Sequence, residues 1–237
     1  GFAHLFEHLM FRGTRAVENF DLPVQMASGD NNAFTNNDYT DFYITLPKDN
    51  LETALWLESD RMEGLDITPA KLEAEKKVVI EEFRQRYLNQ PYGDQTMLLR
   101  ALAYKVHPYR WAAIGLATDH IAGATLADVE SFYRAHYRPS NAILSISADM
   151  EEERMLELAE KWFAPLADHP SATAAIPQEP MQTQARRQEV ERDVPASTVT
   201  VAYHMCARTK LDFYTADLVS DLLSGGDSGR LYTCLLY

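Results

Sequence analysis

The stretch Gly1-Phe-Ala-His-Leu-Phe-Glu-His-Leu-Met10 opens the chain and predicts an amphipathic helix over residues 1–12. His4 and His8 stand four positions apart, which places their side chains about 40° apart around a helix and about 6 Å apart along it. Both imidazoles can therefore reach one ion. Glu7 lies beside them, where a carboxylate can accept a proton from a metal-bound water that zinc has made more acidic. The alternative is a helix that carries two ordinary histidines on a solvated face.

A third metal ligand must come from another part of the chain, and a helix that presents carboxylates among apolar residues is the best source. The stretch Glu75-Lys-Lys-Val-Val-Ile-Glu-Glu82 is such a helix. Glu75 and Glu82 fall on one of its faces, and that face also carries Val78 and Val79. Burying two carboxylates beside two valines is costly unless a positive group lies between them. A zinc ion bound by two imidazoles is such a group.

These considerations assign Glu82 as the third ligand. Glu75 is then the residue that hydrogen-bonds a ligand histidine or orients the water. Glu81 points about 100° away from this face, and we interpret Glu73 and Glu81 as solvated residues of the helix surface. An ordinary ion pair remains the alternative for Glu75.

Composition excludes several classes of partner. The 237-residue chain has 35 acidic and 22 basic residues and a formal net charge of −13. This charge repels a phosphate backbone, and no Lys/Arg stripe offsets it locally, so we expect no nucleic-acid partner. No stretch approaches the roughly 18 uninterrupted apolar residues of a membrane helix, so we expect no membrane span. Cys206 and Cys234 form neither a C-x-x-C pair nor a framework, which argues against thiolate zinc sites.

Helix and strand patterns alternate along the chain, as in α+β folds. Periodicity predicts helices at residues 50–62, 69–88, 95–104, 126–136 and 151–162, and strands at 39–46 and 141–148. Thr68 is the expected N-cap of the helix at 69–88. The Asn-rich stretch 31–37 is typical of a turn and leads into the strand at 39–46, which predicts a hairpin or a sheet edge.

The chain divides into two parts. We expect a first domain at residues 1–165, a linker rich in Pro, Ala, Ser, Thr and Gln at 166–184, and the beginning of a second domain at 185–237. The second domain predicts strands at 189–193 and 198–204 and a helix at 212–224 that ends at Gly225 and Gly226. Because the chain opens on Gly rather than Met and its second unit is short, we expect it to be truncated at both ends.

The motifs together resemble the pitrilysin and insulinase family, the inverzincins, which includes insulin-degrading enzyme and mitochondrial processing peptidase. The resemblance runs over nearly the whole chain. It rests on Gly1-Phe-Ala-His-Leu-Phe-Glu-His-Leu-Met-Phe-Arg-Gly-Thr14, Asn32-Ala-Phe-Thr35, Thr40-Asp-Phe-Tyr43 and Glu75-Lys-Lys-Val-Val-Ile-Glu-Glu82. Further matching segments are His107-Pro-Tyr109, Tyr137-Arg-Pro-Ser-Asn141, Val194-Pro195, Leu223-Ser-Gly-Gly226 and Gly229-Arg-Leu-Tyr232.

The resemblance implies a site and a fold. His4, His8 and Glu82 would hold one Zn²⁺ per chain, with Glu7 as the general base and Glu75 in support. A second set of residues, at the edge of the sheet, would pair with the substrate backbone as an added strand: Asn32, Ala33 and Phe34. The fold would be a peptidase unit with helices packed on a mostly antiparallel sheet, followed by the start of a related unit. Such units enclose a chamber that admits peptides and unfolded segments.

The chain departs from the family pattern in places. The strands that precede the zinc helix are absent, and the second unit stops at Tyr237. The family's arginine–tyrosine pair, which steadies the substrate carbonyl oxygen, is not seen: Leu236 stands where the arginine is expected. We therefore expect a homodimer, or a heterodimer with a related subunit that supplies the pair.

Two functions are compatible with the sequence. The first is a zinc metalloendopeptidase that acts on peptides, and the second is a non-catalytic scaffold or assembly subunit that keeps the fold. The intact H-x-x-E-H spacing favours the first. The natural substrate and the compartment are not fixed by the sequence, although we expect a cytoplasmic or periplasmic location in a bacterium.

Overall fold

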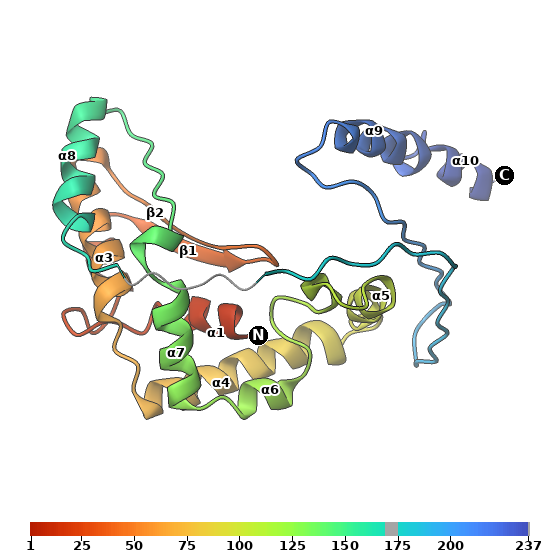
Figure 1. Ribbon diagram of the computed structural model, residues 1–237, viewed down its shortest axis with the longest axis horizontal. Coiled ribbons are helices and arrows are strands. Elements are labelled where there is room, and N and C mark those ends of the chain that lie inside the picture. The colour runs from red at the N-terminus through yellow and green to blue at the C-terminus, as the bar shows by residue number, and fades with distance from the viewer. Residues whose placement is uncertain (169–174, 237) are drawn as a thin grey trace. The chain divides into compact units, whose positions relative to one another are not determined.

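The computed structural model describes residues 1–168 and 175–236 and divides the chain into two compact units, Gly1–Pro195 and Ala196–Tyr237 (Figure 1). Part of the expected linker, residues 169–174, lies outside the described residues, as does Tyr237. The expected domain boundaries stay a prediction. Among the described residues, none of the helices combines the length and the apolar character that a bilayer crossing requires.

The first unit consists mainly of helices around one short β-hairpin, which confirms the α+β class. Its elements are α1 (Phe2–Leu9), α2 (Asp21–Met26), β1 (Asp30–Thr35), β2 (Thr40–Thr45), η1 (Lys48–Asn50), α3 (Leu51–Gly64), α4 (Pro69–Phe83), η2 (Arg84–Leu88), α5 (Gln95–Ala103), η3 (Pro108–Arg110), α6 (Thr118–Ala122), α7 (Leu126–His136), η4 (Pro139–Asn141) and α8 (Glu152–Phe163). The longer helices begin and end within about two residues of their expected positions, except that α4 gives way to a π-helical turn, η2, where a continuous helix was predicted.

The hairpin is antiparallel, with Thr35 opposite Thr40 and Ala33 opposite Phe42. The strand expected at 39–46 is confirmed as β2. The turn expected at 31–37 is wrong for residues 31–35, which form β1. Asn and Asp are poor strand formers in isolation, but pairing with β2 and packing on α1 outweigh that weak preference.

The main core lies where α1 packs against α4 and α7. Phe6 of α1 is fully buried, and its ring lies 5.1 Å from that of Phe132 and 5.2 Å from that of Tyr137. Val79 on α4 and Val129 on α7 are also fully buried. Together these contacts fix the orientation of α1 relative to α4 (Figure 1).

Helix α4 begins as the sequence predicts, because the Thr68 side chain accepts a hydrogen bond from the N–H of Lys71. One expectation about its faces is wrong. Val78 is 44% exposed, whereas Val79 is fully buried. The buried arc centres on Val79, and Glu75 and Glu82 lie along one margin of it, so Val78 falls just beyond that margin.

A smaller core surrounds Arg61 of α3, which is 1% exposed. Its guanidinium lies 4.4 Å from the ring centroids of both Phe20 and Phe42. It also donates to both carboxylate oxygens of Glu58, one turn earlier. The packing of these rings joins α2, β2 and α3 around one buried cation.

Residues 175–195 lie along α5 and the loop that follows it. The Glu179 carboxylate accepts hydrogen bonds from three successive backbone N–H groups, those of Lys105, Val106 and His107, at 2.8–2.9 Å. Arg186 donates to carbonyls at the end of α5, at 2.8 and 3.0 Å. This strap, defined as residues 175–195, is therefore attached to the rest of the first unit by ionic side chains.

The strands expected at 141–148, 189–193 and 198–204 are wrong for this structure, which has none of them in strand pairing. An alternating pattern becomes a strand only when a neighbour accepts its hydrogen bonds, and the described residues provide no neighbour for these segments. Ile143 accordingly stays 98% exposed.

The second unit contains α9 (Asp212–Ser224), which has the bounds that the sequence predicts, and α10 (Arg230–Leu236). Gly225 and Gly226 end α9. Gly226 has φ of +64°, a backbone conformation that a residue with a β-carbon rarely adopts.

Candidate metal centre

Helix α1 presents the histidine pair. Leu5, Phe6 and Leu9 are buried on one side of this short helix and hold it against the core. His4 and His8 lie one turn apart on the side that faces α4, with ring centroids 4.9 Å apart. His4 is 7% exposed, so its imidazole is largely removed from water.

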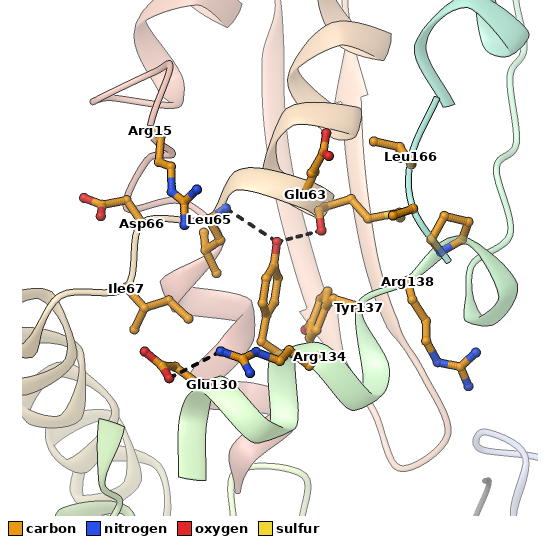
Figure 2. A pocket seen from close by; sticks show the side chains of 14 residues that line it. Arg15, Glu63, Leu65, Asp66, Ile67, Glu130, Arg134, Tyr137, Arg138 and Leu166 are labelled. Atoms are coloured by element: carbon orange, nitrogen blue, oxygen red, sulfur yellow. Dashed lines mark hydrogen bonds and ion pairs between the residues drawn. The ribbon is translucent and has the colours of Figure 1, made fainter. Parts of the chain in front are cut away.

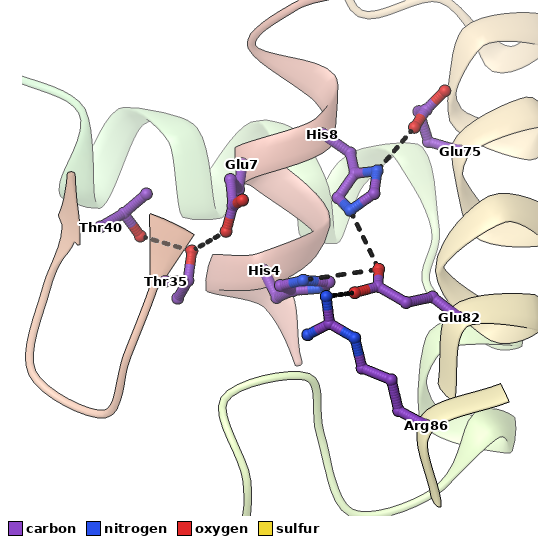
Figure 3. Close-up of polar contacts among 8 residues, drawn as sticks. All are labelled: His4, Glu7, His8, Thr35, Thr40, Glu75, Glu82 and Arg86. Carbon is purple, nitrogen blue, oxygen red and sulfur yellow. Dashed lines mark hydrogen bonds and ion pairs between the residues drawn. The ribbon is translucent and has the colours of Figure 1, made fainter. Parts of the chain in front are cut away.

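Helix α4 brings Glu82 to the two imidazoles (Figure 3). Glu82 Oε2 lies 3.3 Å from His8 Nε2 and 3.6 Å from His4 Nε2. One ligand atom from each of the three residues lies within 4.8 Å of the others. The structure thus brings the three predicted ligands together from two helices far apart in the sequence.

The donor set fits zinc. Two ligand atoms about 2.1 Å from a tetrahedral ion lie about 3.4 Å from each other, which is close to the 3.3 and 3.6 Å separations of Glu82 Oε2 from the two Nε2 atoms. Glu82 Oε2 is buried, yet no hydrogen bond satisfies it among the described residues. A buried carboxylate oxygen rarely stays unsatisfied, and a cation between it and the imidazoles removes the deficit.

Glu75 sits behind His8. Its Oε2 atom lies 3.3 Å from His8 Nδ1, and its Oε1 atom accepts hydrogen bonds from the guanidinium of Arg12. An N–H on His8 Nδ1 that points at Glu75 leaves the Nε2 lone pair facing Glu82. Glu75 therefore selects the tautomer of His8 that can bind a metal through Nε2.

Burial and charge act differently on the two histidines. For His4, burial is the largest influence and lowers its pKa despite the nearby charge of Glu82. Burial also acts to lower the pKa of His8, but the hydrogen bond to Glu75 and the charge of Glu82 outweigh it, so the pKa is raised. For Glu75, burial acts to raise the pKa, while His8 and Arg12 lower it overall.

Two arginines of the site were not predicted from the sequence. Arg86 of η2 contacts Glu82 Oε1 at 2.8 Å, and Arg12 pairs with Glu75 just past the end of α1. The spacing could have indicated both arginines. Arg86 stands four residues after Glu82, and Arg12 four after His8, so a continuous helix would place each on the same face as a predicted site residue. Both arginines hold carboxylates whose other oxygen faces a histidine.

Glu7 points from α1 toward the hairpin (Figure 3). Thr35 Oγ1 donates a hydrogen bond of 2.5 Å to Glu7 Oε2, and Thr35 Oγ1 lies 3.1 Å from Thr40 Oγ1. Glu7 is close enough to His4 and His8 for its charge to act on the pKa of both. Thr35 belongs to the motif Asn32-Ala-Phe-Thr35, which resembles the family, but its distance from Glu7 along the sequence does not predict this contact.

The other acidic residues of α4 lie outside the site. Glu73 pairs with Lys76, and Glu81 with Arg84. The side chains of both glutamates are more than half exposed. Their interpretation as solvated surface residues is confirmed.

The predicted substrate-binding residues lie on β1, which pairs with a strand on one side only among the residues that the structure describes. Asn32 and Phe34 are on its exposed face, whereas Ala33 is half-buried on the face toward the core. The N–H of Ala33 donates to Asn32 Oδ1 at 2.8 Å. β1 is therefore an edge strand, and the three predicted residues directly precede Thr35 on it.

The cavities between described residues of the first unit include two of unequal size. The larger, of about 510 Å³, is bounded by Leu65, Tyr133 and Tyr137 and by charged residues of both signs, among which Arg134 pairs with Glu130 at 3.7 Å (Figure 2). It contains none of the predicted site residues. The smaller, of about 270 Å³, is lined by Phe2, Trp111 and Phe132 and borders the start of α1.

Comparison with known proteins agrees with this fold. Residues 1–112 match the model for "Insulinase (Peptidase family M16)", and residues 123–237 match the model for "Peptidase M16 inactive domain". Every predicted site residue lies within the first match. The two matches first give the class, that of the M16-type peptidase domains. The chain belongs to the insulinase family, peptidase family M16.

Relatives extend the match over the whole chain. A zinc protease of Helicobacter pylori, PqqE, is 33% identical over 100% of this chain and 54% of its own length. The crystal structure of a protease from the same organism has a TM-score of 0.86 at 32% identity, covering 99% of this chain and 58% of that one. A probable mitochondrial-processing peptidase subunit beta of Arabidopsis thaliana is 24% identical over 90% of this chain and 40% of its own length. The chain spans about half the length of the curated relatives that it matches.

Proposed function

We propose that this chain carries the metal centre of a zinc-dependent metalloendopeptidase. The observation that carries the proposal is the convergence of His4, His8 and Glu82 around a buried carboxylate oxygen that has no hydrogen bond from any described residue. Membership of a family whose relatives are named zinc proteases supports peptidase function. We propose one zinc ion per chain, since the three donors form the one metal-competent cluster among the described residues.

The chain's own residues supply the remaining parts of the reaction. Bound zinc would polarise a peptide carbonyl and acidify water at a coordination position that three protein ligands leave open. Glu7 accepts a proton from the attacking water and later donates it to the leaving amine. Arg86 and Glu75 keep Glu82 and His8 aligned through this cycle.

The substrate is a peptide in extended conformation. β1 pairs with β2 on one side, and a substrate backbone at its other edge would add a third strand through Asn32, Ala33 and Phe34. The cavity beside Phe2 and Trp111 suits an apolar substrate side chain. Enclosure of the site in a chamber, which limits substrates to peptides and unfolded segments, is part of the proposal.

A partner subunit belongs to the same proposal. Several relatives are named as subunits of mitochondrial-processing peptidase. We propose that this chain works as a homodimer, or as a heterodimer with a related subunit whose arginine–tyrosine pair would steady the developing oxyanion.

The decisive test is a Glu7→Gln variant combined with metal analysis. An enzyme keeps its zinc, seen as an anomalous peak between α1 and α4, and loses about 10²- to 10⁴-fold in peptide turnover. Glu73→Gln, an exposed change on α4, is the matched control and keeps full turnover. A chain that binds zinc but is indifferent to Glu7→Gln would be the scaffold subunit instead.

A further inference from the structure

Three hydroxyl groups lead from Glu7 into the core. Thr35 donates to Glu7 Oε2 at 2.5 Å, Thr40 Oγ1 lies 3.1 Å from Thr35 Oγ1, and the hydroxyl of Tyr137 is in hydrogen-bond contact with Thr40. The four residues come from α1, β1, β2 and the end of α7. None of the three hydroxyl residues is a metal ligand or a member of the predicted site.

The direction of this chain follows from the number of protons. A hydroxyl has one hydrogen to donate, and an ionised carboxylate only accepts. Thr35 gives its hydrogen to Glu7, so the contact between the threonines needs Thr40 as the donor. Donors aligned in this way strengthen one another.

The fold fixes Thr35 at this place. Thr35 and Thr40 are directly opposite each other at the closed end of the hairpin, and both side chains lie on the half-buried face toward α1. Tyr137 is packed against Phe6 and Phe42, with ring centroids 5.2 and 6.3 Å away. The hydroxyl that reaches Glu7 is therefore held by sheet pairing and by the core rather than by a mobile side chain.

We propose that Thr35 is a positioning residue for Glu7: it holds Oε2 so that Oε1 faces the attacking water. Glu7 Oε1 has no donor among the described residues, so one carboxylate oxygen is fixed while the other is available for the proton. The inference rests on the proposed function, because it gives Glu7 the role of base. It adds a second role for β1, which would orient the base as well as the substrate.

The experiment compares Thr35→Val with Thr35→Ser in the zinc-loaded full chain. Valine keeps the shape of threonine and removes the hydroxyl, so we expect kcat to fall about tenfold or more while KM changes less than threefold. Serine restores the hydroxyl and recovers most of kcat. Crystal structures give a readout apart from activity: the Glu7 carboxylate leaves its position in Thr35→Val and keeps it in Thr35→Ser.

Two controls separate this role from a structural one. Thr45→Val makes the same change on the outward face of β2 and should leave kcat, zinc content and the thermal midpoint unchanged. Thr40→Val should cost less than Thr35→Val, since Thr35 can still donate to Glu7. Full kcat in Thr35→Val, or equal losses in the valine and serine variants, would overturn the proposal. If Glu7→Gln itself kept turnover, the proposed function would fail first.

Discussion

Glu75 shows how a buried carboxylate can act on a neighbouring histidine. It binds His8 Nδ1 with one oxygen and Arg12 with the other, and it is 1% exposed. The negative charge of Glu75 therefore acts on His8 through one hydrogen bond in a nearly dry environment. Such partners raise the basicity of the ligand and fix its ring.

Glu75→Gln should weaken zinc binding about 10- to 100-fold, because the amide keeps the shape of the side chain but loses its charge. Competition with a chelator of known affinity measures the change. Glu73→Gln, on the exposed side of the same helix, should leave the affinity unchanged. Equal affinities in all three proteins would reduce Glu75 to an ordinary ion-pair partner of Arg12.

The sequence was informative about the site residues for a geometric reason. Spacing within one helix determines which side chains share a face, and this was enough to group His4 with His8 and Glu75 with Glu82. Spacing does not determine which helices meet. The contact between Thr35 and Glu7 depends on how the hairpin packs on α1, so it became visible only in the structure.

Among the elements, the hairpin depends on a buried cation. Arg61 lies between the rings of Phe20 and Phe42, and one of its guanidinium nitrogens, Nη1, is buried without a hydrogen bond in the described part of the chain. Burial acts to raise the pKa of Glu58 and outweighs the opposing effect of Arg61. Removal of either member of this pair therefore leaves the other buried without its partner, at the full cost of desolvation.

Arg61→Met should lower the free energy of unfolding by about 3 kcal/mol, since it leaves Glu58 unpaired beside the aromatic rings. Urea unfolding measures the loss. The double variant with Glu58→Gln should recover part of it, because no uncompensated charge remains. An exposed substitution, Arg84→Met, should change stability by less than about 0.5 kcal/mol. A loss no larger for Arg61→Met than for Arg84→Met would contradict this account.

Long elements were predictable and short ones were not. α7 and α9 have the predicted bounds because periodicity and end signals agree over many residues. α2 and α6 have six and five residues, too few for a period to emerge. The segment 141–148 has a strand pattern without a strand partner in the described structure, since pairing is a property of two segments and not of one.

For the molecule as a whole, the strap at residues 175–195 is held by a carboxylate in an unusual state. Partial desolvation acts to raise the pKa of Glu179, but the N–H groups of three successive residues outweigh it and lower the pKa to about 2. A depressed pKa means that the stabilisation is present above the ordinary value of 4.5 and is lost as the pH falls from there toward 2.

Glu179→Gln should therefore destabilise the first unit at pH 6, and the difference from the wild type should narrow as the pH falls from 4.5 toward 2. Urea midpoints at a series of pH values measure it. Glu191→Gln, a change in the same strap on an exposed side chain, is the control. A difference that stayed constant across this range would show that the ionised carboxylate does not hold the strap.

The two helices of the metal centre are far apart along the chain: Glu82 stands 74 positions after His8. An ion bound by both helices would close a long loop of the chain, which contains α2, the hairpin and α3. By analogy with disulfides, closing a loop of this length lowers the conformational entropy of the unfolded chain. This stabilises the folded state by about 4 kcal/mol. The same ion would then act in catalysis and as a cross-link of the fold. Chelators should therefore lower the stability of this part of the fold at the same time as they abolish its activity.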